Sequence, residues 1–340
     1  MWQYSTKFIK LMNELDAVSA VICVASHAEY FRKAGINTIL VPEWVSNTSK
    51  VSKLRPLLWF LYSFWLALKL YVSHGNTRIV STTHHGLPLL KNQTITIHDL
   101  RPYWHPDSFM QRVYFRFMLR SKANKVTDII TVSNAVRSLI NKTYRVPMNK
   151  ISVVYNSVDA GEFVSKVGKE NFFLAVGASW EHKNIHTFLL HSELWADKHA
   201  LTIICGKTSY ADYLKEIVAQ RGLENVVTIM HEVSFSTLKE LYANALALVY
   251  PSKDEGFGIP PIEAFASNTP VIVSDIPVFR EVLQDYAIYV DPQDSASWKK
   301  ALETLSILPE GKNRFSACVD LYSMTSMKAM IKVWLARGAK

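Results

Sequence analysis

The chain has 340 residues, a length that predicts two domains at about 150 residues each. Hydrophobic residues make up 49% and charged residues 20%, a balance that excludes an intrinsically disordered chain. The formal net charge is +9, but residues 1–165 carry 20 Lys and Arg against 9 Asp and Glu, whereas residues 166–340 carry 18 against 20. The basic first half therefore predicts an anionic partner.

Cysteine usage and the first residues indicate the compartment. Cys23, Cys205 and Cys318 are far apart and form no CxxC pair, which argues against a disulfide framework or a zinc site. Charged residues interrupt the first 15 positions, so they do not read as a secretory signal. Together these features predict a cytoplasmic protein.

Short β-branched runs alternate with helical patterns along the first half, which is typical of parallel α/β units. An opening helix is expected at about residues 2–15, and two further helices at 109–120 and 134–142. The predicted strands cover residues 20–24, 38–41, 78–80, 94–97, 128–132 and 151–154.

The most apolar run, LLWFLYSFWLALKLYV at residues 57–72, predicts another helix. It carries Lys69 and is shorter than the roughly 20 residues that a membrane-spanning helix needs. The run is therefore either a buried helix or one that lies on a membrane surface. The core helix is the favoured interpretation, because aromatic-rich helices usually pack inside.

Apolar periodicity lapses over residues 159–171, where we place a domain boundary, giving domains 1–165 and 166–340. The predicted strands of the second half cover residues 172–176, 201–205, 226–229, 247–250, 271–273 and 288–290. This alternation predicts a second doubly wound, Rossmann-like domain, with ligands in the loops after the strands. The final helices, at about 315–337, have no strand after them and are expected to pack back on the first domain.

The loop after strand 247–250 carries the most information. Its sequence EGFG (255–258) combines a carboxylate with glycines that let backbone amides approach a ligand closely. Pro260 and Pro261 then suit the first turn of a helix, whose N-terminus favours phosphate. Glu263 lies about one turn further on, and two such carboxylates can accept hydrogen bonds from paired sugar hydroxyls.

The segment EGFGIPPIEAFASNTPVIVSD resembles the signature E-G-F-G-x-P-x-x-E-A-x-A of the family 4 retaining glycosyltransferases, and FREVLQDYAIYVDP extends the likeness. The resemblance covers most of the chain from about residue 94. It implies a GT-B fold, in which two Rossmann-like domains face each other across a cleft. It also implies transfer of a hexose from a nucleotide sugar, with retention of anomeric configuration.

The resemblance implies a donor site in the second domain. Glu255 and the loop amides would hold the sugar, Glu263 the ribose, and Lys183 the diphosphate. The segment AVGASWEHKN resembles the family's G-x-x-x-x-R-K-N, with His182 in place of the Arg. The full set of expected donor-binding residues is Gly177, His182, Lys183, Gly206, Lys207, Glu255, Gly256, Phe257, Gly258, Ile259 and Glu263.

In the first domain, His98 and Asp99 follow the predicted strand 94–97, and family members carry a similar histidine facing the donor sugar and phosphate. His98 is therefore expected to be catalytic together with Lys183 and Glu255, while Asp99 would orient the acceptor. His84 and His85 follow the preceding strand and would border the acceptor side. No third ligand stands at a recognisable spacing from these histidines, and no D-x-D occurs, so neither a metal nor another cofactor is implied.

The family mechanism is same-face attack assisted by the leaving phosphate, so Glu255 is not assigned as a nucleophile. Lys183 and helix-start amides would instead stabilise the departing diphosphate. One feature departs from the family, because this sequence opens within the expected first helix, without the strand and glycine-rich loop that usually precede it; either the given start is late or the protein works without that loop. This departure prompts an alternative function, a catalytically inactive subunit that binds a sugar nucleotide or polysaccharide.

The expected activity is transfer of mannose from GDP-mannose in the synthesis of a surface polysaccharide such as O-antigen. The acceptor would be a saccharide or a polyprenyl-diphosphate-linked glycan at the inner face of the cell membrane. The basic half and the aromatic helix suit peripheral docking on an anionic membrane surface. Nucleic-acid binding is not expected, because no helix-turn-helix, aromatic RNA-binding strand or basic stripe is found.

Overall fold

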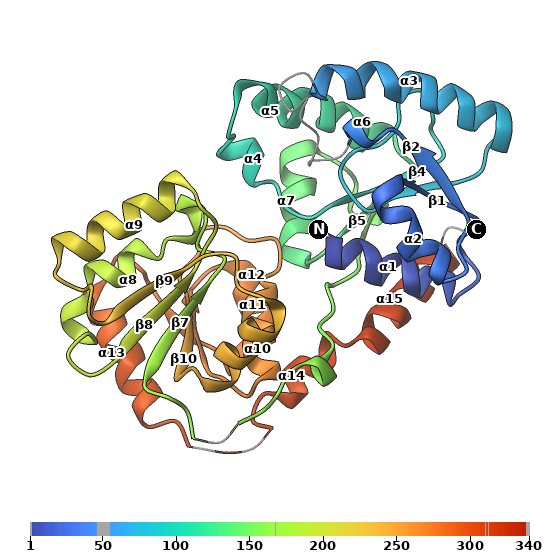
Figure 1. Ribbon diagram of the computed structural model, residues 1–340. Coiled ribbons are helices and arrows are strands. Elements are labelled where there is room, and N and C mark those ends of the chain that lie inside the picture. Colours follow the sequence, from blue (N-terminus) through green and yellow to red (C-terminus); the bar gives the residue numbers. More distant parts are fainter. Residues whose placement is uncertain (1, 46–54, 167, 310, 312, 338–340) are drawn as a thin grey trace. The chain divides into compact units, whose positions relative to one another are not determined.

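The computed structural model describes residues 2–45, 55–166, 168–309, 311 and 313–337. Its internal contacts divide the chain into two compact units (Figure 1). The first comprises Met1–Val132, Val136–Val154 and Met327–Lys340, and the second comprises Ser133–Ala135 and Tyr155–Ser326. Both units are α/β structures with parallel sheets, as the sequence predicts.

The strands of the first unit form two parallel sheets instead of the one continuous sheet expected. Among the described residues, β1 (Val21–Val24) pairs with β2 (Thr38–Val41), and the second sheet has the order β3-β4-β5-β6. No described strand pairs with members of both sheets. The strands of the second sheet are β3 (Ile79–Ser81), β4 (Gln93–Ile97), β5 (Asp128–Thr131) and β6 (Ile151–Val153).

The helix expected at residues 109–120 extends to residue 125, and a π-helical turn interrupts its α-helical geometry. A π-helical turn, η2 (Tyr114–Met118), separates α5 (Phe109–Val113) from α6 (Leu119–Lys125). The other helices on this part of the chain are α1 (Trp2–Asn13), α2 (Ala25–Lys33), η1 (Glu43–Val45), α3 (Arg55–His74), α4 (Arg101–Trp104), α7 (Asn134–Tyr144) and η3 (Met148–Lys150).

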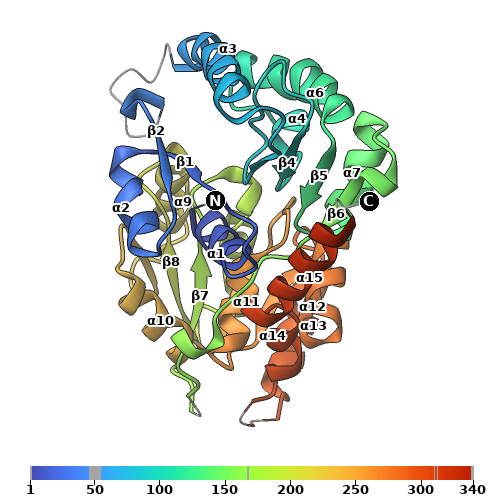
Figure 2. The ribbon, with the colours of Figure 1, turned by 90° about the vertical axis from the view of Figure 1, so that its right-hand side faces the viewer.

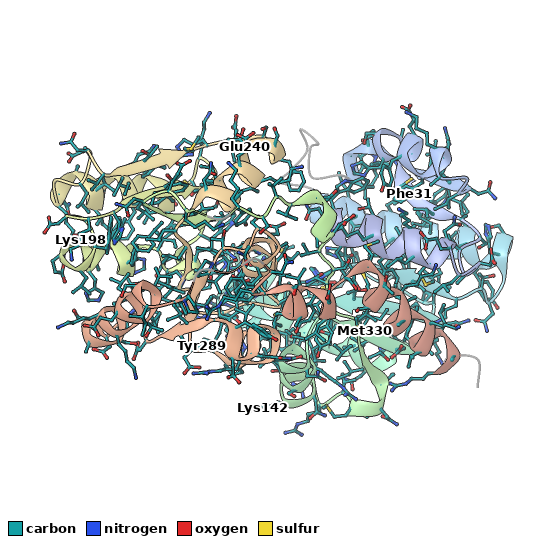
Figure 3. All side chains as sticks on the ribbon, turned by 90° about the horizontal axis from the view of Figure 1, so that it is seen from below. Phe31, Lys142, Lys198, Glu240, Tyr289 and Met330 are labelled. Atoms are coloured by element: carbon teal, nitrogen blue, oxygen red, sulfur yellow. The ribbon has the colours of Figure 1, made fainter. Side chains whose placement is uncertain are left out.

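Separate apolar clusters hold the first unit together. Phe31 of α2, labelled in Figure 3, packs in a small cluster with β1. A larger cluster joins β4 and β5 to α6 through residues such as Ile95, Ile129 and Leu119, all fully buried. A third lies beneath α3 and includes Leu66, Ala67, Leu70 and Leu87. Ile22 and Ile39 of the first sheet and Ile79 of the second pack against this third cluster, so α3 contacts both sheets.

The last helix, α15 (Met324–Arg337), lies against α1 in Figures 1 and 2. The ring of Trp334 is buried, packs near Phe8 of α1, and donates a hydrogen bond from Nε1 to the Asp128 carboxylate. The Arg78 guanidinium lies 4.8 Å from the Trp334 ring centre. Lys328 adds an ion pair to Glu14 at 2.8 Å. These contacts fix α15 to the first unit.

The second unit has one parallel sheet with the order β12-β11-β10-β7-β8-β9. Its strands are β7 (Phe172–Val176), β8 (Ala200–Ile204), β9 (Val227–Met230), β10 (Ala247–Tyr250), β11 (Val271–Ser274) and β12 (Ile288–Val290). Its helices are η4 (Ala160–Glu162), η5 (Glu181–Lys183), α8 (His186–Leu190), η6 (Ser192–Leu194), α9 (Ser209–Gln220), α10 (Phe235–Asn244), α11 (Ile259–Ala266), α12 (Pro277–Leu283), η7 (Gln284–Tyr286), α13 (Ser295–Ser306) and α14 (Ser316–Leu321).

Both faces of the second sheet are covered. Phe173 and Ala175 of β7 pack on one face with α8, α9 and α13, while Leu174 between them is equally buried on the other. Strands buried on both faces are typical of doubly wound sheets, and they leave the strand ends as the available binding edge.

Candidate active site

The second unit has its topological switch point between β7 and β10. From β7 the chain proceeds outward through β8 and β9, then crosses to β10 and proceeds through β11 and β12. In open parallel sheets, ligands bind at the carboxyl ends of the two strands where the order reverses. The loops after β7 and β10 are therefore the expected binding edge, and they contain Lys183 and Glu255.

Lys183 and Glu255 form an ion pair that joins these two loops. Lys183 Nζ lies 2.5 Å from Glu255 Oε1, and the two side chains are 15% and 13% exposed. Lys183 Nζ also donates to Tyr250 Oη at 2.7 Å and lies 5.0 Å from the centre of that ring. Burial and the neighbouring Glu255 carboxylate raise the pKa of Tyr250 well above its ordinary value, so the phenol stays neutral.

The backbone adds a second link between the same loops, because the amide of Lys253 donates to the carbonyl of His182 at 2.8 Å. His182 thus belongs to the site through its backbone. The Lys183 ammonium is held by the side chains of Glu255 and Tyr250, at a place where a diphosphate could displace the carboxylate from it.

The glycine loop has the geometry that the sequence predicts. Gly258 has φ of +92°, and a Cβ there would lie 2.7 Å from Cε1 of Phe279, so only glycine fits. It immediately precedes α11, whose first turn holds Ile259 and the expected prolines. Ser133 Oγ donates to the Gly256 carbonyl at 2.8 Å and fixes the orientation of that peptide.

The Phe257 side chain is not available to a ligand. It is 2% exposed and packs beside the rings of Tyr155 and Tyr322. The group of Phe257 that could hold a sugar or phosphate oxygen is therefore its backbone amide, not its ring.

Glu263 lies in the second turn of α11 and is 7% exposed. Its Oε2 accepts a hydrogen bond of 2.9 Å from Tyr242 Oη. Burial together with the Glu263 carboxylate raises the pKa of Tyr242 well above its ordinary value, so the phenol remains a donor. The carboxylate is thereby oriented before any ligand arrives.

The loops after β7 and β8 are also joined. Gly177 follows β7 with φ of +71° and begins a turn to Ser179. The amide of Gly206 donates to Ser179 Oγ at 2.7 Å, and Thr208 Oγ1 donates to the Ser179 carbonyl at 2.8 Å. Lys207 lies on the same loop, but its ammonium is mostly exposed and is 3.7 Å from Glu232. These hydrogen bonds join the loop of Gly177 to the loop of Gly206. Lys207 pairs with Glu232 and is not part of the group formed by Lys183, Glu255 and Tyr250.

In the first unit, His98 follows β4 and its Nε2 lies 2.9 Å from the carbonyl oxygen of Thr82. Burial lowers its pKa to about 4, so the ring is neutral at pH 7. A carbonyl can only accept, so Nε2 carries the proton and Nδ1 is left as an acceptor. The ring also contacts Tyr4 of α1 edge to face, at 4.7 Å between centres.

The rings of His84 and His85, in the loop after β3, are tilted by 45° to each other with their centres 4.2 Å apart. His84 also packs against Phe115, and burial lowers its pKa to about 3. Asp99 accepts the backbone amide of Arg101 at 3.1 Å at the start of α4, which is a local turn contact. The structure thus gathers the histidines at the carboxyl ends of β3 and β4, as predicted.

Sequence reasoning missed Tyr250 and Tyr242, the two phenols that hold Lys183 and Glu263. Tyr250 is the last residue of β10, directly before the loop, so its place at a strand end was the available signal. Tyr242 lies in α10, and its sequence context gives no comparable signal.

Among the described residues, no three His, Cys, Asp or Glu side chains are grouped so that they could hold a metal ion. No helix in the described ranges is both long enough and apolar enough to cross a membrane.

Comparisons with known families match two segments of the chain. Residues 161–317 match the model described as "Glycosyl transferases group 1", and residues 54–162 match "Glycosyltransferase Family 4". The O-antigen chain mannosyltransferase RfbU of Salmonella typhimurium is 54% identical over 338 residues, which cover 99% of this chain and 96% of RfbU. The chain belongs to the family 4 glycosyltransferases. As a member of that family it is a retaining glycosyltransferase.

More distant proteins agree with this assignment. The serotype-specific mannosyltransferase WbdA of Escherichia coli is 36% identical over 135 residues, which are 38% of this chain and 17% of WbdA. Sucrose-phosphate synthase from Thermosynechococcus elongatus has a TM-score of 0.72 at 17% identity, covering 89% of this chain and 84% of that one. Anabaena HepE, solved with UDP and glucose, also has a TM-score of 0.72, at 14% identity over 97% and 95% of the two chains. These structures confirm the predicted GT-B fold class.

Proposed function

We propose that this enzyme transfers mannose from GDP-mannose to a growing O-antigen chain. Support for mannose and for O-antigen comes from the 54% identity to RfbU over nearly the whole of both proteins. GDP as the nucleotide is part of the proposal, and the titrations below test it against UDP and dTDP.

The observation that carries the proposal is the pair formed by Lys183 and Glu255 at the switch point, 2.5 Å apart. A bound diphosphate offers Lys183 a stronger anionic partner, and the released Glu255 can then accept hydrogen bonds from sugar hydroxyls. Pro260 and Pro261 have no N–H, so the backbone amides of the glycine loop and of Ile259, together with the positive end of the α11 dipole, would stabilise the charge that develops on the leaving diphosphate. Glu263, held by Tyr242, would bind the ribose hydroxyls.

His98 would contact the sugar and not the phosphate, a narrower role than the resemblance implies. Its Nδ1 is an acceptor, so it suits a sugar hydroxyl and not a phosphate oxygen, which has no proton to give. We assign the acceptor to the first domain (1–165), on the side of His84, His85 and Asp99, and the donor to the second (166–340). The enzyme's partners are then a nucleotide sugar, a polyprenyl-diphosphate-linked or saccharide acceptor, and the anionic inner face of the cell membrane.

Donor binding is tested by titration calorimetry with GDP-mannose, UDP-glucose and dTDP-glucose. Wild-type protein is expected to bind GDP-mannose most tightly, and Glu263→Ala to weaken that binding by about tenfold or more, because the ribose hydroxyls lose a charged acceptor. Glu216→Ala, on the exposed side of α9, is the matched control. Equal affinity of Glu263→Ala and wild type would refute the ribose assignment. The alternative, an inactive binding subunit, predicts normal GDP-mannose binding with no transfer to any acceptor.

A further inference from the structure

Helix α3 is apolar on two opposite faces. Its inward face consists of residues at spacings of three and four, Ser63, Leu66, Ala67 and Leu70, all buried. Its outward face repeats the same spacing with large side chains that are exposed, namely Phe60, Leu61, Phe64, Trp65, Leu68, Tyr71 and Val72. A helix on the surface of a protein in water normally carries polar residues there. The expectation of a core helix is therefore wrong for the outward face.

A second exposed apolar group lies on the helical run from α5 to η2. Phe109 is 75% exposed and Phe117 is 69% exposed, and Met110 and Met118 are exposed beside them. Between these residues stand Arg112 and Arg116, whose side chains are also exposed.

Both groups adjoin one loop, residues 84–90. Leu87 packs in the same cluster as Leu66 and Leu70 of α3. From the other helical run, Lys122 Nζ donates to the Gly86 carbonyl at 2.5 Å, and Tyr114 Oη donates to the His84 carbonyl at 3.1 Å. Figures 1 and 2 show α3 and α6 at the same end of the first unit. The two exposed groups therefore flank the loop that carries the acceptor-side histidines.

The two segments of sequence that carry this surface have basic residues only; Asp107, the carboxylate directly before α5, is paired with Arg101 at 2.9 Å. Residues 44–98, which contain α3, include six Lys and Arg and no Asp or Glu. Residues 108–127, which contain α5, η2 and α6, include five Lys and Arg and again no acidic residue. On α3 the Lys69 ammonium lies 5.2 Å from the Trp65 ring centre. Exposed aromatic and aliphatic side chains among cations are typical of surfaces that insert into the headgroup region of an anionic bilayer.

We propose that the outward faces of α3 and of the α5–η2–α6 run form one docking surface for an anionic phospholipid bilayer. α3 would lie in the plane of the interface, with its aromatic rings among the acyl chains and the nearby Lys and Arg at the phosphates. The loop 84–90 is then held at the depth of the headgroups. This last step rests on the proposed function, because a lipid-linked acceptor presents its diphosphate at that depth.

The test is cosedimentation with vesicles of phosphatidylcholine, with and without phosphatidylglycerol. The wild-type protein is expected to bind the anionic vesicles at low salt. The triple variant Phe64→Ser, Trp65→Ser, Leu68→Ser is expected to bind at least about tenfold more weakly. Arg112→Gln and Arg116→Gln are each expected to cost about fivefold and to reduce the salt dependence. Tyr213→Ser, an exposed aromatic residue on α9 of the second unit, is the matched control and should bind like wild type.

Three results would overturn the proposal. The wild-type protein could fail to bind anionic vesicles, or the triple variant could bind them as tightly as wild type. Alternatively, sedimentation without lipid could show a wild-type dimer and a monomeric triple variant, which would assign the surface to a second copy of the chain. A circular dichroism spectrum and a thermal unfolding midpoint like those of wild type verify that the triple variant is folded. Since the vesicle assay uses neither donor nor acceptor, its outcome is independent of whether mannose is transferred.

Discussion

At the scale of single residues, pairs of side chains hold the groups of the proposed donor site in place before any ligand binds. Lys183 and Glu255 neutralise each other in the free enzyme, and Tyr250 and Tyr242 hold Lys183 and Glu263 in place. Removing one member of a largely buried pair leaves the other charge unpartnered, which costs more than the pair itself contributes. Variants at these positions therefore need separate measurements of folding and of activity.

The glycine before α11 gives the sharpest prediction at this scale. Gly258→Ala combines a positive φ with a Cβ that would lie 2.7 Å from the Phe279 ring, so we expect a loss of roughly 2 kcal/mol or more of unfolding free energy. Gly222→Ala is the matched control, because its φ is also positive (+64°) but a Cβ there meets nothing within 4 Å. It should lose about 1 kcal/mol. Chemical denaturation of both variants measures the difference, and equal losses would contradict the proposed clash.

The buried histidines predict how stability changes with pH. Burial lowers the pKa of His98 to about 4 and that of His84 to about 3, both from an ordinary value of 6.5. Between pH 6.5 and about 4 the unfolded chain binds protons that the folded chain does not, so stability is complete above pH 6.5 and falls as the pH decreases. The slope is at most about 1.4 kcal/mol per pH unit for each histidine.

Urea unfolding at a series of pH values checks this slope. His98→Gln should flatten it, because the glutamine cannot take up a proton. His74→Gln, at an exposed position on α3, should leave it unchanged. A wild-type stability that is constant over this range would contradict neutral, buried histidines.

At the scale of elements, α15 is the one whose role the contacts define most clearly. Trp334→Ala removes a ring that packs near Phe8, lies under Arg78 and donates to Asp128, so we expect a loss of about 3 to 5 kcal/mol. Val333→Ala, one position earlier and 58% exposed, should change the stability little. Thermal unfolding of the two variants compares them directly. Similar melting temperatures would mean that α15 contributes little to the first unit.

Most elements could be predicted from the sequence, because short β-branched runs between helical patterns identify parallel strands. Each predicted strand is present with ends within a single residue of the expected ones, as at residues 38–41 and 247–250. The outward face of α3 could not be predicted, because a helix that is apolar all round has the same pattern whether or not a second layer covers it. The π-helical turn at residues 114–118 depends on packing around Phe115 and has no local signature.

The site was predictable where its chemistry is local. EGFG followed by two prolines specifies a strand, a close-approach loop and a helix start, and the structure has all three. The phenol of Tyr242 could not be assigned to Glu263 in the same way, because their contact joins α10 to α11 across 21 positions of sequence. Long-range contacts of this kind depend on the fold.

At the scale of the whole molecule, the uneven charge of the sequence has two explanations. In the proposed function the second unit would bind phosphate through Lys183 and the backbone amides of the glycine loop, so it would need no excess of basic residues. The first half carries the excess, and much of it surrounds α3 and the α5–η2–α6 run. An enzyme arranged in this way would take its donor from solution in one unit and approach a membrane-bound acceptor with the other.

The most direct test of the account is transfer of radiolabelled mannose from GDP-mannose to lipid-linked O-antigen intermediates by the purified protein. Wild type is expected to transfer mannose with retention of configuration. Lys183→Ala should be slower by about a hundredfold or more, because the leaving diphosphate loses its cation. Lys215→Ala, an exposed lysine on α9, should be as active as wild type. Undiminished transfer by a folded Lys183→Ala variant, or no transfer by a wild-type protein that binds GDP-mannose, would contradict the account.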